Sequence, residues 1–238
     1  MDMNKHSSKQ NNTSISSQTL NQLRAAVLGA NDGIVSTAAV IMGVAGATDN
    51  TGAIFTAGLA ALVAGALSMA VGEYVSVSSQ SDAEKAFIQR EKKLLKSHPK
   101  EQLDELTRAY IEKGINEKTA RQVAVELTKT DALKAHLMVE FGVDEDDVVS
   151  PVHAAVASLV SFTVGGLIPF VAILLAPQDI RIWVTGVAVV FALCATGYMS
   201  ASVGGASKRR AILRVVVGGV VAMAVTYAIG SLFGTAIG

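Results

Sequence analysis

Cysteine, aromatic residues and net charge are all scarce in this chain of 238 residues. The single cysteine, Cys194, excludes a disulfide framework and any zinc site built from several cysteines. Twenty basic residues balance twenty acidic ones, so the chain lacks the basic excess of a nucleic-acid-binding protein and we expect no such partner. Because aromatic residues make up only 5%, the core must consist of aliphatic and small side chains.

Charged residues are also few, at 17% of the chain, whereas soluble domains typically contain about 25%. Half of all residues are apolar, and the mean hydropathy is +0.42. The charges that do occur are segregated, since residues 82–147 contain 15 acidic and 12 basic side chains. This distribution predicts a polar insert between two apolar blocks.

Long stretches without charged residues predict membrane spans. Four such runs contain 23, 31, 26 and 24 residues, and a membrane-spanning helix needs about 20 apolar residues. A run of 16 residues that follows Asp32 is long enough only if Asp32 itself lies within the span. We therefore predict an all-α integral membrane protein that crosses the lipid bilayer five times. The predicted transmembrane helices cover residues 23–47, 52–76, 152–176, 181–204 and 211–236.

The polar insert is expected to form three helices between the second and third spans. Pro99 and Gly114 separate them, and Asn116 can cap the third. Either Thr130 or Asp131 can cap a further helical stretch that ends at residue 141. The predicted domains are a disordered leader (1–22), transmembrane helices 1 and 2 (23–78), the helical insert (79–150) and transmembrane helices 3 to 5 (151–238).

Lysine and arginine are distributed unequally between the two sides of the predicted bundle. Nineteen of the twenty fall on the side of the insert, and only Arg181 falls on the other. The positive-inside rule then predicts that the N-terminus and the insert are cytoplasmic and that the C-terminus is outside. The membrane would be the cell membrane in a bacterium and the vacuolar membrane in a eukaryote.

Asp32 is the most informative single residue. It is expected about eight residues into the first span, or about 12 Å from its start. A carboxylate at that depth costs at least about 2.5–3.5 kcal/mol, and such residues usually mark ion or proton pathways. The alternative is that Asp32 caps a helix starting at Gly33, which would leave a span of about 16 residues, shorter than the usual range.

The second span carries a stripe of side chains four residues apart. The stripe consists of Ala57, Ala61, Gly65, Met69 and Glu73. Its small residues allow close helix approach, while the thioether of Met69 and the carboxylate of Glu73 suit a transition metal better than Ca²⁺ or Mg²⁺. Packing is the alternative role for Met69. Together with Asp32, the stripe predicts a metal path.

Carboxylates also recur at helical spacings in the insert, accompanied by histidine and methionine. The candidate ligands there are Glu91, Glu101, Glu105, His136, Met138 and Glu140. Carboxylates from several helices can form a site for a divalent cation, and histidine or methionine adds preference for a transition metal. The alternative is that these are solvated helix faces with lysine partners. The Glu-x-x-His pairs of di-iron bundles are absent, and without a nucleophile–base arrangement we expect no enzyme.

Four sequence segments resemble the vacuolar iron transporter family. The two longest are Leu-Arg-Ala-Ala-Val-Leu-Gly-Ala-Asn-Asp-Gly-Ile-Val-Ser-Thr (23–37) and Gly-Ala-Leu-Ser-Met-Ala-Val-Gly-Glu-Tyr-Val-Ser (65–76). The stretch 131–143 looks like the end of the family's cytoplasmic domain, and 213–219 is similar to its last helix. The resemblance covers residues 20–233. It implies a bacterial-type member that acts as a homodimer and exports Fe²⁺, with Mn²⁺ as a second candidate, in exchange for protons.

The resemblance also implies roles for individual residues. Asp32 and Met69 match the family's ion path, and Glu91, Glu105 and Glu140 fall on positions of its metal-binding domain. Met138 lies near a methionine position, and His136 lies where a ligand could substitute.

The sequence also departs from the family at several positions. Ala61, Leu94 and Gln102 stand where iron-binding eukaryotic members carry glutamate. Glu73, Glu101 and Asp104 are then candidate replacements, and the number of bound ions is open.

Divalent-metal/proton antiport is the leading functional hypothesis. The metal is the cargo, and no permanently bound cofactor is expected. One alternative is a membrane-anchored metal sensor or storage module whose insert binds metal without transport. Another is a structural membrane protein whose acidic insert recruits partners.

Overall fold

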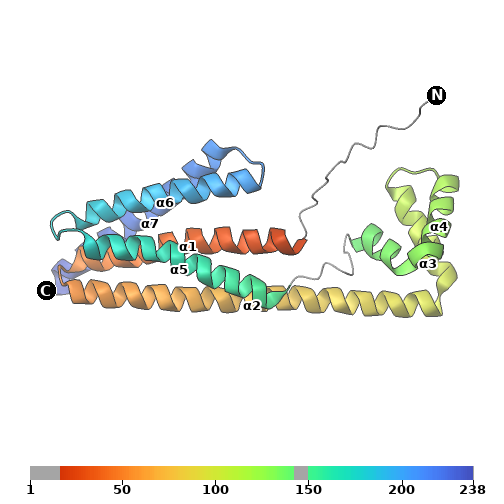
Figure 1. The fold of residues 1–238 in the computed structure, drawn as a ribbon, viewed down its shortest axis with the longest axis horizontal. Coiled ribbons are helices and arrows are strands. Elements are labelled where there is room, and N and C mark those ends of the chain that lie inside the picture. Colours follow the sequence, from red (N-terminus) through yellow and green to blue (C-terminus); the bar gives the residue numbers. More distant parts are fainter. Residues whose placement is uncertain (1–16, 142–149, 238) are drawn as a thin grey trace, which may run out of the picture.

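The computed structural model describes residues 17–141 and 150–237, and all regular elements within these ranges are helices. Five of the helices are long and apolar enough to cross a membrane, as the charge-free runs predict, and the all-α fold is confirmed (Figure 1). The five are α1 (Ser17–Ala47), α2 (Thr51–Ser97), α5 (Pro151–Leu175), α6 (Arg181–Val203) and α7 (Lys208–Ile237).

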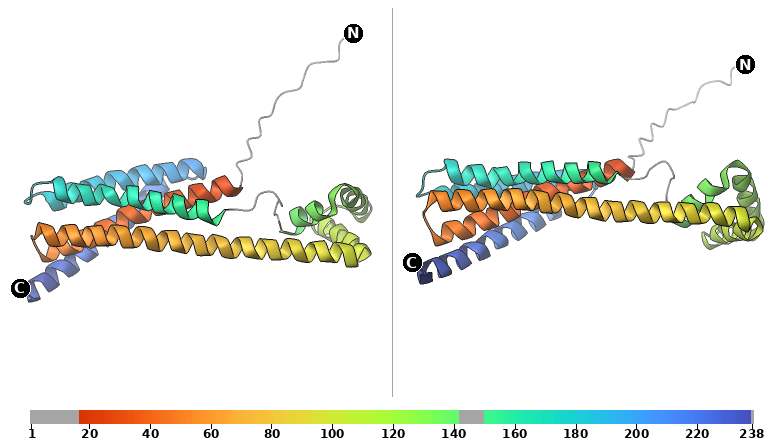
Figure 2. Two further views of the ribbon diagram at one scale, coloured as in Figure 1. Left: turned by 60° about the horizontal axis from the view of Figure 1, so that its bottom comes forward. Right: turned by 90° about the horizontal axis from the view of Figure 1, so that it is seen from below.

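Helix α2 continues far beyond the membrane bundle and carries the insert at its end (Figures 1 and 2). The insert comprises α3 (Pro99–Glu112), α4 (Glu117–His136) and a π-helical turn, η1 (Leu137–Phe141). We call the side of the bundle from which α2 extends the insert end, and the opposite side the loop end.

The helix boundaries in the insert follow from local chemistry. Pro99 occupies the first turn of α3, where its missing N–H costs no hydrogen bond. Gly114 follows α3 with a φ of +89°, a conformation that glycine adopts without steric cost. The side chain of Asn116 accepts a hydrogen bond from the backbone N–H of Thr119 at 3.0 Å and so caps α4.

Asp131, rather than Thr130, caps the last stretch of α4. The backbone of Asp131 is extended (φ −160°, ψ 96°), and its Oδ1 accepts a hydrogen bond from the N–H of Lys134 at 3.0 Å. Thr130 instead donates its hydroxyl to the carbonyl of Glu126 in the preceding turn. The structure thereby decides between two capping residues that the sequence leaves equivalent.

Three expectations about helix starts need correction, and two predicted segments fall outside the described ranges. Helix α1 begins at Ser17, so the last residues of the predicted disordered leader (1–22) are helical. Because α1 runs without a break through Asp32, the alternative in which a helix starts at Gly33 is wrong. Helix α7 begins at Lys208, three residues before the predicted start of the span. Residues 1–16, and the acidic stretch 144–147 of the predicted insert, lie outside the described residues.

Glycines bring α1 and α5 into direct backbone contact. A Cβ added at Gly33 would lie under 3.0 Å from the carbonyl group of Phe162, and one at Gly165 would meet the carbonyl group of Ala30 equally closely. The close approach therefore requires glycine on both helices. Successive helical residues point about 100° apart, so Asp32 does not share the face that Gly33 buries against α5, and Asp32 is exposed on the single chain.

At the loop end, Arg181 fastens the turn between α1 and α2 to the start of α6. Its side chain is 4% exposed. Nη2 donates to Oδ1 of Asp49 at 3.1 Å, and Nη1 lies 3.4 Å from Oγ1 of Thr51. The only basic residue on its side of the predicted bundle thus has a structural role in addition to its value for orientation.

Candidate metal path

The three candidate residues in the membrane bundle lie on α1 and α2 at different depths. Glu73 is near the insert end, Met69 lies one turn or about 6 Å deeper along α2, and Asp32 lies within the span of α1. The side chain of Asp32 is exposed on the single chain. Met69 is half-buried beside a cluster formed by Leu62, Ala66 and Phe162, so its packing role is present in the structure.

Glu73 is held in an ion pair with a cation on the neighbouring helix. Its Oε1 lies 3.6 Å from Nη2 of Arg24, and its side chain is only 11% exposed. Among the described residues, no hydrogen-bond donor reaches this Oε1 atom. The carboxylate is therefore largely buried and neutralised by charge, and its Oε1 atom is not fixed by a directed hydrogen bond.

The insert brings Glu91 and His136 together. Glu91 lies on the extension of α2, and His136 is the last residue of α4; Nδ1 of the histidine lies 3.3 Å from Oε1 of the glutamate. Their side chains are 6% and 0% exposed, respectively. A carboxylate and an imidazole at this distance are both transition-metal ligands. They also join α4 to α2, which positions the insert.

The other candidate ligands of the insert do not converge on this pair. Glu101 and Glu105 are exposed on α3, and Glu105 accepts a hydrogen bond from Nε2 of the buried Gln102 at 3.0 Å. Met138 is 55% exposed and lines a hollow of about 240 Å³ beside Lys134. The side chain of Glu140, in η1, lies outside the described part of the chain.

Within residues 17–141 and 150–237, no three His, Cys, Asp or Glu side chains converge closely enough to hold a metal ion. Helical spacing predicts which carboxylates share a face of one helix, but it does not tell which helices become neighbours. The nine predicted residues therefore divide into a membrane group on α1 and α2 and an insert group on α2, α3, α4 and η1.

Sequence reasoning missed the role of Arg24. The positive-inside rule accounts for this residue as a topology marker, while the structure brings it to Glu73. Asn31, which is half-buried on α1, also has an Oδ1 atom without a hydrogen-bond partner among the described residues. No sequence spacing links Arg24 to Glu73, because they lie 49 positions apart on different helices.

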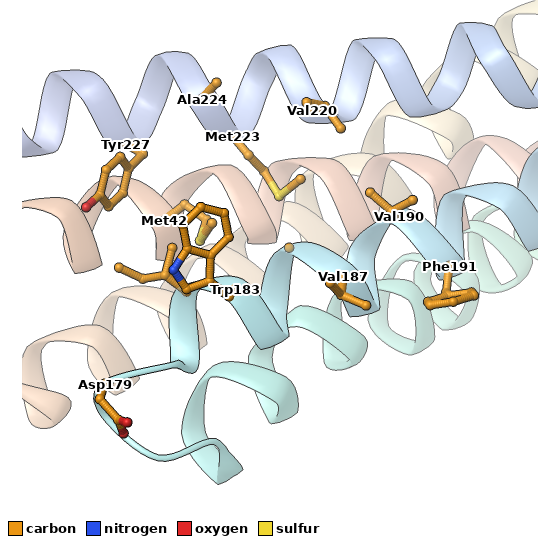
Figure 3. Close-up of a pocket in the computed structure, with 12 residues that line it drawn as sticks. Met42, Asp179, Trp183, Val187, Val190, Phe191, Val220, Met223, Ala224 and Tyr227 are labelled. Atoms are coloured by element: carbon orange, nitrogen blue, oxygen red, sulfur yellow. The ribbon is translucent and has the colours of Figure 1, made fainter.

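A groove of about 570 Å³ lies between α6 and α7, away from these residues (Figure 3). Its lining is mostly apolar, and Asp179 is the single acidic residue among the twelve residues that line it. One carboxylate without further ligands is insufficient for a divalent cation. The groove faces outward from the helices, where acyl chains would fill it in a membrane.

Comparison with known sequences relates nearly the whole chain to one family. A sequence model described as "VIT family" matches residues 23–231. The chain is 41% identical to a protein named vacuolar iron transporter from Acanthamoeba castellanii, over 90% of this chain and 79% of that protein. It is 39% identical to vacuolar iron transporter homolog 1 from Oryza sativa, over 89% and 74% of the two chains, and 36% identical to homolog 3 from Arabidopsis thaliana, over 90% and 84%.

Proposed function

The chain belongs to the VIT family, and on that premise we propose that it exports Fe²⁺ from the cytoplasm in exchange for protons, with Mn²⁺ as a second candidate cargo. The names of its relatives support iron as the cargo. The observation that carries the proposal is the continuous course of α1 through Asp32, which leaves a carboxylate within a membrane-spanning helix. Carboxylates at such depth typically serve ion or proton movement.

The proposed route begins at Glu73, near the insert end of α2, and continues past Met69 to Asp32. Oxygen and thioether ligands in succession suit a borderline transition metal. Both carboxylates can bind either a metal ion or a proton. Protonation from the far side of the membrane would therefore release the metal and couple its export to proton entry.

We propose that the insert collects metal on the cytoplasmic side. The buried Glu91–His136 pair supplies two ligands at 3.3 Å, and Glu101, Glu105, Met138 and Glu140 are the further candidates from the same domain. A metal that draws these groups together would require a rearrangement of α3 and η1. The metal is the cargo, and no resident cofactor is proposed.

The exposure of Asp32 on the single chain favours a homodimer. A carboxylate facing lipid is unfavourable by at least about 2.5–3.5 kcal/mol, and a second copy that covers this face of α1 would remove the cost. Light scattering of the detergent-solubilised chain measures its mass. A monomer at all concentrations would contradict this part of the proposal.

The proposed orientation has the N-terminus and insert in the cytoplasm and the C-terminus outside, because nineteen of twenty Lys and Arg residues lie on the insert side. The membrane is the cell membrane in a bacterial host or the vacuolar membrane in a eukaryotic one.

Flux through reconstituted protein tests the function directly. We expect proteoliposomes containing the full chain to move Fe²⁺ faster than protein-free liposomes, and an imposed pH gradient to change the rate. Competing Mn²⁺ should slow the Fe²⁺ flux, whereas Mg²⁺ should not. Metal binding without flux would instead favour the membrane-anchored sensor or storage module.

Glu91→Gln should weaken metal binding by the insert. Replacing a charged oxygen ligand by an amide removes the attraction to a divalent cation, and a loss of about tenfold or more is expected for a ligand substitution. Calorimetry of the detergent-solubilised full chain with Mn²⁺ measures this. Glu112→Gln, on the exposed side of α3, is the matched control, and an equal effect of both substitutions would argue against Glu91 as a ligand.

A further inference from the structure

The ion pair between Arg24 and Glu73 has an unusual distribution of burial. The acidic partner is the buried one, with 11% of its side chain exposed, while the arginine side chain is 62% exposed. A second ion pair among the described residues of the bundle, between Arg181 of α6 and Asp49 in the turn before α2, is reversed, since Arg181 is 4% exposed and Asp49 is 82% exposed. In the first pair, therefore, the group that can leave for water is the cation.

The two pairs also differ in how firmly they are held. Arg181 donates a hydrogen bond to Asp49 at 3.1 Å and has Thr51 as a second polar neighbour. Arg24 lies 3.6 Å from Glu73, and Oε1 of Glu73 accepts no hydrogen bond from any described residue. A long, largely solvated arginine without a directed bond is weakly held, whereas the buried carboxylate still requires a positive charge nearby.

We propose that Arg24 is a displaceable counter-cation for Glu73, which occupies the entrance of the path until a divalent metal ion replaces it. Arg24 neutralises the buried carboxylate while no metal is bound. Arriving metal competes with the guanidinium for the same oxygen atoms, and Arg24 then swings toward the aqueous phase at the insert end.

The proposal rests on the transport function proposed above and adds a selectivity step to it. A monovalent ion gains less than a divalent ion from replacing the guanidinium, because the Coulomb attraction to the carboxylate scales with charge. Arg24 thereby keeps the entrance neutral without metal and raises the concentration of metal needed for entry. It is a positioning residue, since it acts through Glu73.

Arg24→Gln removes the internal competitor, and we expect the KM for Fe²⁺ flux in proteoliposomes to fall by about three- to fivefold, the upper end of the range for a partly exposed ion pair. Arg24→Lys keeps the charge and should restore a KM within about twofold of the original. In a Glu73→Gln background, Arg24→Gln should leave the KM unchanged, because the group it competes for is gone.

Loss of positive charge near the entrance could by itself attract cations, so a matched control is needed. Arg209→Gln removes the same charge in the first turn of α7, which begins at the same end of the bundle as α1 (Figure 1), and its KM should stay within about twofold. An unchanged or higher KM for Arg24→Gln, or an equal fall in the Glu73→Gln background, would overturn the proposal.

Metal binding by the unmodified chain, Arg24→Gln and Arg209→Gln tests the role of Arg24 separately from the transport function. If the unmodified chain moves no metal, the proposed function fails, and equilibrium Mn²⁺ binding to the detergent-solubilised chain then decides the role of Arg24. Tighter Mn²⁺ binding by Arg24→Gln than by the unmodified chain and by Arg209→Gln supports displacement. Equal binding by all three contradicts it.

Discussion

Asp32→Asn is expected to reduce metal flux to the background of protein-free liposomes while the protein remains folded. Asparagine has nearly the same volume as aspartate but carries no charge and cannot exchange a proton for a metal ion. The side chain of Asp32 is exposed on the surface of α1 rather than packed into the core of the single chain, so its replacement removes no buried contact within the fold of one chain. Transport should therefore fail without a loss of stability.

Proteoliposome flux of Fe²⁺, together with a thermal unfolding curve of the same preparation, measures both halves of this expectation. Asp179→Asn is the matched control, because it makes the same chemical change at an exposed position in the turn before α6. The control should transport normally. If Asp32→Asn carried Fe²⁺ at the unmodified rate, the route through α1 would be wrong.

Gly33→Ala should destabilise the fold, although alanine ordinarily favours a helix. The added Cβ would come under 3.0 Å from the backbone of Phe162 on α5, and backbone cannot move aside as the end of a flexible side chain can. Overpacking of this kind costs about 1–3 kcal/mol, and more where relief is difficult. We expect the thermal midpoint to fall by about 5 °C or more.

Gly186→Ala tests whether this loss arises from the contact between helices. Gly186 lies inside α6, and nothing would meet its added Cβ within 4 Å, so helix propensity should leave the midpoint unchanged or raise it. Opposite responses of the two glycines are expected in thermal unfolding of the solubilised chain. A midpoint for Gly33→Ala equal to that of the unmodified protein would show that α1 and α5 can separate at low cost.

Asp32 and Gly33 are adjacent in α1, and the packing of Gly33 determines which face of the helix carries Asp32. Gly33 lets α1 lie against the backbone of α5, and this contact sets the rotation of α1 about its axis. Asp32 lies about 100° around the helix from Gly33 and is exposed on the single chain. Helix α1 is continuous at Gly33, and the glycine serves close packing against α5.

The helices themselves could be predicted because their signals are local. Charge-free runs identify the spans, since apolar length alone decides whether a helix can cross a bilayer. Pro99, Gly114 and Asn116 mark helix ends through their own backbone and side-chain chemistry. The sequence does not distinguish Thr130 from Asp131 as the cap of the last stretch of α4, because both residue types can cap a helix. Only the backbone conformation distinguishes them.

The arrangement of the candidate ligands could not be predicted in the same way. His136 and Glu91 are 45 positions apart, and they meet only because α4 folds back against the extension of α2. Helical spacing predicted Glu105 as a metal ligand in the same way as Glu91. In the structure, however, Glu105 lies on the exposed side of α3. Spacing reports one helix at a time, whereas a site depends on the faces that several helices turn toward one another.

By itself, the amino-acid sequence determined a five-span helical membrane protein with a polar insert and a carboxylate within the first span, because hydropathy, helix caps and charge are properties of short segments. The tertiary structure alone decided that Arg24 neutralises Glu73, that His136 joins Glu91 and that Asp32 is exposed on the single chain. These outcomes depend on helix rotation and close approach. Both are set by contacts between residues far apart in the chain, for which a single sequence contains no local signal.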